Sequence, residues 1–389
     1  MFTENEVGLT SLAEIGPSLL QVPRDTYSHL RHSYASFLKK LARKVPSSSH
    51  QLWFELLDKI LEYATDEVSD GEPVGAAITN PIGQAVEALL DYWYQTEPSI
   101  GAGLPESIKL RLTRLFNPQP KEYVHGRVIM AAHLISLYTG DPLWTSQKLL
   151  PLFSWSTNPE EVRELWKGYL WTPRVNAELL DAFKSSFLAT AHHYNDLGKH
   201  NSQYASLLTA AALELRPHFT EPELRTAFNA LPKQGLAESA KMLARSLVSA
   251  EERRKEYWSN RVKPLIESIW PKSHDMRSSH ESTALARICV HTQSLFPEAV
   301  GFLKPLLTKT KNYYLPLHEL AESGLAKSYP LEALSLLSAM VDEDESWPSE
   351  DLKTCLDQIS STKSDVTSDS NFRRLKEYCA RYDRSTGTT

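Results

Sequence analysis

Two short stretches decide the fold: FPEAV at residues 296–300 and YPLEAL at residues 329–334. In each, an aromatic residue and a proline precede an acidic residue and further apolar residues, as at the start of an α-helix with proline in its first turn. The two prolines are 33 residues apart, close to the length of one helix-turn-helix repeat. The pattern predicts stacked helix pairs. Its alternative is two unrelated helices that both begin with proline.

The rest of the chain has the same helical character. Apolar residues in 179–194 recur on one helix face, and Asn158 and Thr220 each precede a proline and a glutamate as N-cap residues do. Strict alternation of apolar and polar residues, the mark of a half-buried strand, is hard to find. Only 15 of 389 residues are glycine, few for a fold with many tight turns. We predict an all-α, elongated helical-repeat array, an α-solenoid of the HEAT or TPR type, with about 17 to 20 helices.

Polar connectors suggest how this array is divided. The longest, at residues 65–83, contains several glycines and prolines, and a second lies at 271–282. The sequence therefore predicts an N-terminal helical subdomain at residues 1–70, a central helical region at 80–270, C-terminal helix-pair repeats at 280–384 and a flexible tail at 385–389.

Charge and cysteine content limit the partners and the compartment. The chain has 42 Lys and Arg against 48 Asp and Glu, a net charge of -6, so nucleic acid is not an expected partner. Basic runs at residues 39–44 and 373–376 have the character of solvated helix ends. Three widely spaced cysteines without a CxxC motif fit reduced thiols. With no secretory signal and no long apolar segment, we expect a cytoplasmic protein without membrane association.

A search for catalytic motifs is mostly negative. The sequence has no phosphate-binding GxxxxGK[ST] loop, no HExxH, no GxSxG and no protein-kinase signature. His29 and His32 share a helix face, but no cysteine or carboxylate lies at the spacing of a zinc site. We therefore predict no catalytic residue, no bound metal and no cofactor.

One pair of residues supports an alternative. Arg24 and His29 match the arginine-to-histidine spacing of HEPN ribonucleases, in which arginine stabilises phosphate charge and histidine transfers a proton. Pairs with this spacing are expected roughly twice by chance in such a chain. Three occur, the other two being Arg127/His133 and Arg43/His50. The non-catalytic interpretation is that Arg24 and His29 are solvent-facing polar residues near a helix N-terminus.

Tryptophan is frequent, with nine residues in the chain. Exposed aromatic residues often dominate the energetics of protein interfaces. On this basis the candidate partner-binding residues are Trp166, Trp171, Trp258 and Trp270. The alternative is that these side chains fill gaps between helices in the core.

Several phrases of sequence occur together in a recognisable order. They are WKGYLW at 166–171 with Pro173 and Arg174 behind it, EYWSNRV at 256–262 leading into IWPKS at 269–273, FPEAV at 296–300, ESGL at 322–325 and CLD at 355–357. On these phrases, residues 160–384 resemble the helical domain of unknown function that follows a sirtuin-type NADase domain in bacterial anti-phage defence proteins.

The resemblance implies a function for the helical part alone. In that family the sirtuin domain depletes NAD on infection, and the helical part is associated with sensing a phage component, inhibiting the enzyme or assembling it. In sirtuins the sequence Gly-Ala-Gly is followed by a serine and a Gly-Ile-Pro-Asp segment. This fingerprint is missing here, since residues 101–103 (GAG) match only its first three residues. The expectation is a non-enzymatic sensor or scaffold that recognises a sirtuin-type NADase domain or a phage protein. Assembly into a homo-oligomer is a further expected interaction. The alternative functions are a HEPN-like ribonuclease and a general helical-repeat scaffold for protein or nucleic acid.

Overall fold

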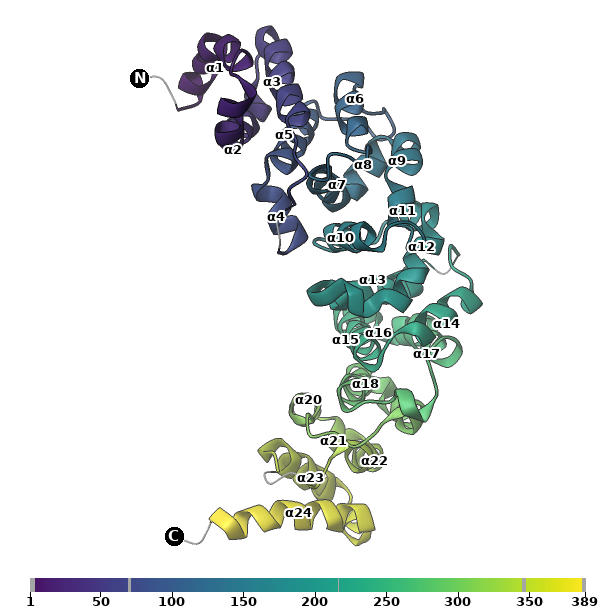
Figure 1. Ribbon diagram of the computed structural model, residues 1–389. Coiled ribbons are helices and arrows are strands. Elements are labelled where there is room, and N and C mark those ends of the chain that lie inside the picture. The colour runs from purple at the N-terminus through teal and green to yellow at the C-terminus, as the bar shows by residue number, and fades with distance from the viewer. Residues whose placement is uncertain (1–3, 69–70, 216, 345–347, 387–389) are drawn as a thin grey trace. The chain divides into compact units, whose positions relative to one another are not determined.

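The computed structural model describes residues 4–68, 71–215, 217–344 and 348–386 (Figure 1). Within these ranges all regular structure is helical except for one isolated β-bridge between Thr310 and Val341. The prediction of an all-α fold is confirmed. None of the helices in the described ranges is both long enough and apolar enough to cross a membrane.

The helices form two compact units. Unit 1 comprises residues 1–190 and 195–203, and unit 2 comprises residues 191–194 and 204–389. The division passes through the 3-10 segment η4 (Thr190–His200), inside the range 80–270 that the sequence analysis treats as one region. Residues 198–203 (GKHNSQ) form a polar, glycine-containing run at this point, a compositional signal that the expected boundaries do not use.

Unit 1 is built around two central helices, α5 and α7. Helices α2, α3, α4 and α7 pack on α5, while α4 and α10 pack on α7. The α-helices of this unit are α1 (Glu4–Leu20), α2 (Arg24–Leu41), α3 (His50–Glu62), α4 (Pro73–Thr79), α5 (Pro81–Gln95), α6 (Glu106–Arg114), α7 (Tyr123–Ala132), α8 (Leu134–Gly140), α9 (Pro142–Lys148), α10 (Pro159–Tyr169), α11 (Ala177–Ala182) and α12 (Lys184–Ala189). Short 3-10 segments are η1 (Ala42–Lys44), η2 (Ser47–Ser49) and η3 (Leu150–Phe153).

Local sequence explains where several of these helices begin. The Asn80 side chain accepts a hydrogen bond of 2.8 Å from the Ile82 amide, and Asp141 accepts one of 3.0 Å from the Trp144 amide. In both cases proline follows the capping residue, where its missing N–H costs nothing. Helix α4 also begins with proline and lies within the connector expected at 65–83, which is therefore partly helical.

The glycine of the WKGYLW stretch has a packing role. Gly168 faces α7, and a Cβ atom at this position would lie only 2.9 Å from the carbonyl oxygen of Val128. Glycine therefore allows α10 to lie close against α7, which fixes the position of the residues that follow α10.

In unit 2 the helices stack in two rows. One row runs through α15, α18, α20 and α23, and the other through α19, α22 and α24. The α-helices are α13 (Asn201–Glu214), α14 (Glu221–Ala230), α15 (Lys233–Ser249), α16 (Arg254–Tyr257), α17 (Lys263–Ser268), α18 (Ser279–His291), α19 (Phe296–Leu303), α20 (Tyr314–Ser323), α21 (Leu325–Ser328), α22 (Pro330–Met340), α23 (Glu350–Thr362) and α24 (Ser370–Thr386). A π-helical turn, η6 (Trp258–Val262), joins α16 to α17, and the short 3-10 segments are η5 (Glu251–Arg253), η7 (His274–Met276), η8 (Gln293–Leu295), η9 (Lys304–Leu306) and η10 (Ser364–Ser368).

The two stretches that predict a repeat occupy equivalent places in this stack. They open the neighbouring helices α19 and α22, and the rings of Phe296 and Tyr329 lie 6.1 Å apart. Pro264, which is 33 residues before Pro297, stands in the first turn of α17 and extends the same spacing by one step. No aromatic residue directly precedes this third proline, so the sequence pattern alone does not connect it with the other two.

Three details differ from the sequence-based expectations. The described residues form helices numbered to α24, more than the 17 to 20 expected, because some predicted helices are broken. The stretch 179–194 is one example: it divides at Phe183, where the backbone leaves the helical region, and again at η4. At the other end of the chain, α24 continues two residues into the expected tail, and residues 387–389 lie outside the described ranges.

The helix-start predictions have mixed outcomes. The capping box at Thr220 is confirmed, since its amide donates to Glu223 at 2.7 Å and its hydroxyl accepts from the Glu223 amide. Helix α10 begins at Pro159 as expected, but the Asn158 side chain makes no capping hydrogen bond. Glu160 and Glu161 in the first turn still provide favourable charge for the helix dipole.

A half-buried ion-pair cluster joins α18 to α20 in unit 2. Arg287 donates three hydrogen bonds to Glu319, from Nη2 to Oε1 at 2.7 Å and from Nε to Oε2 at 3.0 Å and to Oε1 at 3.1 Å. The His291 ring lies 3.3 Å from the same carboxylate. Burial opposes ionisation, but the hydrogen bonds and charges of His291 and Arg287 outweigh it and lower the pKa of Glu319 to about 2.

We expect Glu319→Gln to lower the free energy of unfolding by about 2 to 3 kcal/mol near neutral pH, since glutamine keeps one acceptor but loses the charge. A carboxyl group with a lowered pKa stabilises the fold above its unfolded pKa, so the difference from wild type should shrink as pH falls from 4.5 towards about 2. Denaturant unfolding over this pH range measures it. The exposed Glu322→Gln on the same helix is the control, and a pH-independent difference would contradict the assignment.

Candidate functional site

The structure separates the four candidate tryptophans into two classes. Trp166 and Trp258 have no exposed surface and Trp270 is 3% exposed, whereas Trp171 is 43% exposed. Only Trp171 is available to a partner in this conformation. The other three are corrected from interface candidates to core residues.

The packing of the three buried indoles explains the correction. Trp166 stacks on Phe183 with ring centroids 5.5 Å apart and donates a hydrogen bond of 3.2 Å to the Phe153 carbonyl. Trp270 donates one of 2.8 Å to Glu281, and Trp258 donates one of 3.3 Å to a glutamate of α19. Each apolar ring is enclosed and each N–H is satisfied, as expected for tryptophan in a core.

Trp171 lies two residues beyond the end of α10, at the start of an extended segment that leads to α11. Its ring is flanked by two side chains from η4: the Lys199 Nζ atom is 5.4 Å from the ring centroid, and the His200 ring is 5.9 Å away. His200 Nε2 in turn lies 3.1 Å from the carboxylate of Glu72, the N-cap of α4. These contacts orient the indole without covering it.

A groove of about 390 Å³ lies beside Trp171. We call it the Trp171 groove. Its apolar surface comes from α4, α7 and α8, and Trp171, Thr172 and Arg174 of the connection between α10 and α11 form one side. The lining residues are Val74, Ile78, Glu87, Ile129, Ala132, His133, Ile135, Ser136, Trp171, Thr172 and Arg174.

The charges in the Trp171 groove are unequally satisfied. Glu87 is neutralised by Lys39 at 2.6 Å. His133 Nδ1 is 3.0 Å from the Tyr94 hydroxyl, and burial lowers the pKa of its imidazole, which favours the neutral form. Arg174 is exposed and makes no ion pair within the part of the chain that the structure describes. The groove is therefore apolar with one uncompensated positive charge at its edge.

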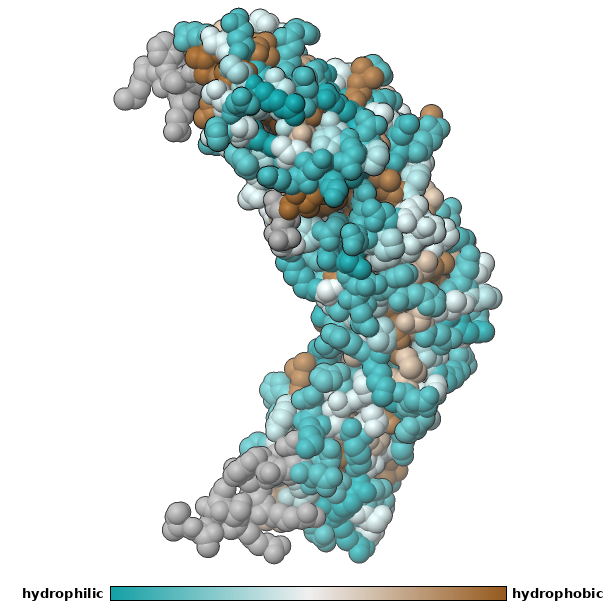
Figure 2. Space-filling view, viewed as in Figure 1, coloured by the Kyte–Doolittle hydropathy of each residue, from teal (hydrophilic) through white to brown (hydrophobic). Residues whose placement is uncertain are grey.

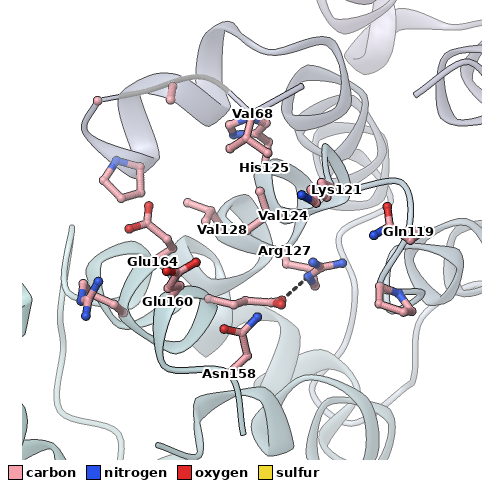
Figure 3. A pocket seen from close by; sticks show the side chains of 16 residues that line it. Val68, Gln119, Lys121, Val124, His125, Arg127, Val128, Asn158, Glu160 and Glu164 are labelled. Atoms are coloured by element: carbon pink, nitrogen blue, oxygen red, sulfur yellow. Dashed lines mark ion pairs between the residues drawn. The ribbon is translucent and has the colours of Figure 1, made fainter. Parts of the chain in front are cut away.

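A larger cavity of about 600 Å³ lies on the other side of α4, between α7 and α10. Figure 3 shows Glu160 and Glu164 on one side of it, Lys121 and Gln119 on the other, and the guanidinium of Arg127 in between. Arg127 pairs with Glu161, and Glu164 lies 3.5 Å from Lys167. Because these charges pair within unit 1, the cavity has no clear preference for a ligand of either sign.

Three ionisable groups of this cavity, His125, Arg127 and Glu164, have shifted pKa values, and burial, the largest cause for each, lowers the pKa of Arg127. Burial lowers the pKa of His125, which is 3% exposed, and raises the pKa of Glu164. Shifts of this kind occur at active sites and also in structural ion-pair networks. Because Glu164 pairs with Lys167 and Arg127 pairs with Glu161, we interpret these shifts as those of a structural ion-pair network.

The structure does not assemble Arg24 and His29 into a ribonuclease site. Both side chains are exposed on α2, and residues five apart on a helix point about 140° away from each other. The Arg24 guanidinium lies over the ring of Tyr63 instead, 5.4 Å from its centroid. This contact gives Arg24 a structural partner at the residue immediately after α3.

The basic runs are partly paired. Lys39 contacts Glu87, and Arg43 contacts Asp91 at 2.6 Å. In the second run, Arg374 contacts Glu343 and Lys376 contacts Asp357. Such runs offer less free positive charge to a phosphate backbone than their sequence suggests.

The cysteines and possible metal ligands offer no alternative site. All three cysteines are buried, and burial raises the pKa of Cys355 to about 12, which suppresses the reactive thiolate. Among the described residues, no group of three or more His, Cys, Asp or Glu side chains has the arrangement needed to hold a metal ion.

Comparison of the chain with known protein families, curated proteins and solved structures finds no match. Sequence reasoning identified Trp171 but missed Arg174 and the apolar groove beside them. Arg174 directly follows Pro173, three residues after the end of the WKGYLW stretch, but nothing in the sequence indicates that the neighbouring faces of α4, α7 and α8 are left uncovered.

Proposed function

We propose that this chain is a non-enzymatic helical recognition module that binds another protein through Trp171 and the groove beside it. The observation that carries the proposal is the exposure of Trp171, 43%, next to an open apolar groove. Tryptophan is enriched among the residues that dominate binding energy, and an apolar recess with a few polar groups is typical of a recognition site.

The resemblance of residues 160–384 supplies the partner in this proposal. Trp171 and Arg174 both belong to the first phrase of that resemblance. We propose a sirtuin-type NADase domain as the partner, which places the chain in a bacterial anti-phage defence system as a sensor or scaffold; a phage protein is the second candidate. The paired charges of the larger cavity and the separation of Arg24 from His29 favour recognition over catalysis.

The first test is complex formation. We expect the full chain to co-purify with a sirtuin-type NADase domain when the two are co-expressed, and to change its rate of NAD consumption. Trp171→Ala should weaken the complex by about 30-fold, because removing an interface anchor costs about 2 kcal/mol.

The matched control is Leu143→Ala, since Leu143 is 68% exposed in unit 1 and lies outside the groove. It should leave binding unchanged. A complex that Trp171→Ala and Leu143→Ala affect equally would contradict the role of Trp171. If neither the NADase domain nor any phage protein is recovered from infected cells, the proposed partner class is wrong.

A further inference from the structure

The Trp171 groove has a chemistry that selects among protein segments. Val74 and Ile78 from α4, Ile129 from α7 and Ile135 from α8 line it, so an apolar side chain is the favoured occupant. Its volume of about 390 Å³ lies within the range of ligand-binding recesses. Figure 2 shows separate hydrophobic patches on a mostly hydrophilic face of the molecule.

The charge at the edge defines a second requirement. Arg174 lines the groove and makes no ion pair among the described residues. A second cation, Lys199, lies against the ring of Trp171. The one carboxylate of the groove, Glu87, is held by Lys39. A guanidinium binds a carboxylate through two parallel hydrogen bonds, so a ligand with an acidic side chain complements this edge.

We propose that the groove binds an extended segment of the partner in which an aliphatic or aromatic side chain is followed or preceded closely by aspartate or glutamate. The apolar side chain enters the groove against Trp171, and the carboxylate pairs with Arg174. This inference rests on the proposed function and specifies the chemistry of the partner at the same site.

The test starts from the full chain and a displayed random-peptide library. We expect selected peptides to contain Leu, Ile, Phe or Trp next to Asp or Glu, and a fluorescein-labelled copy of the dominant peptide serves as the probe in anisotropy measurements. Arg174→Glu should weaken its binding about tenfold through lost attraction and new repulsion. Replacing the peptide's acidic residue by lysine should then restore binding to the Arg174→Glu chain.

Lys148→Glu is the matched control, because Lys148 is exposed in unit 1 and lies outside the groove. Equal effects of Lys148→Glu and Arg174→Glu, or selected peptides without acidic residues, would overturn the inference. A labelled single-stranded oligonucleotide is tested in parallel, and binding that Arg174→Glu abolishes would assign the site to nucleic acid instead.

The experiments distinguish failure of the proposed partner from failure of the proposed groove chemistry. Peptide binding that depends on Arg174, without any complex with the NADase domain, would leave the groove chemistry intact and contradict the named partner. A complex with the NADase domain that is insensitive to Arg174→Glu would support the partner and overturn the groove chemistry. Unchanged unfolding of the Arg174→Glu chain confirms that the charge, and not the fold, has been altered.

Discussion

Replacing Trp166 by alanine is expected to lower the free energy of unfolding by about 3 to 5 kcal/mol. The indole has no exposed surface, stacks on Phe183 and meets Phe153 edge-on at 5.1 Å. Its removal leaves a cavity between α10 and its neighbours and leaves the Phe153 carbonyl without its hydrogen-bond donor. Denaturant unfolding followed by circular dichroism measures the loss.

Trp171→Ala is the matched comparison, because it removes the same side chain five residues away. We expect it to change the free energy of unfolding by less than about 1 kcal/mol, since it loses only partial burial and the contact with Lys199. Similar losses for the two variants would contradict the division of these tryptophans into core and surface.

A comparable loss is expected for Glu122→Ala in unit 1. Glu122 is 3% exposed and pairs with Arg31, which is 7% exposed. The same carboxylate accepts hydrogen bonds of 2.7 Å from the Thr65 amide and 2.8 Å from Asn80. It therefore connects α2, the turn after α3 and the start of α5. Removing it leaves Arg31 as a buried, unpaired charge, which costs about 3 to 5 kcal/mol.

Glu67→Ala is the control for this prediction, because Glu67 is an exposed glutamate in the same turn region whose side chain has no ion pair in the described chain. It should leave stability within about 0.5 kcal/mol of wild type. The double variant Arg31→Met/Glu122→Ala should recover part of the loss, since it removes the stranded charge. No recovery would indicate that Arg31 is not the source of the instability.

The helical class was predictable because it depends on local patterns. Caps and prolines placed the starts of α10, α14, α19 and α22, each within a residue of the observed start. The division at η4 was not predictable in the same way. It depends on which helices pack together across the chain, and the polar run GKHNSQ at residues 198–203 is only a weak local signal for it.

The burial of Trp166 could have been predicted, whereas the groove could not. Val162, Leu165, Trp166 and Tyr169 recur at the spacing of one helix face, and all are buried. Trp171 follows the end of that helix, where the periodicity no longer applies. The groove itself depends on α4, α7 and α8 leaving apolar surface uncovered, which only their packing reveals.

The most direct test of the account is the affinity of the purified chain for a purified sirtuin-type NADase domain, measured by titration calorimetry for wild type and Trp171→Ala. We expect a saturable complex for wild type and a dissociation constant about 30-fold higher for the variant, with the fold of both intact. Absence of binding by the wild-type chain would contradict the proposed complex, and equal affinity of wild type and Trp171→Ala would contradict the role of Trp171.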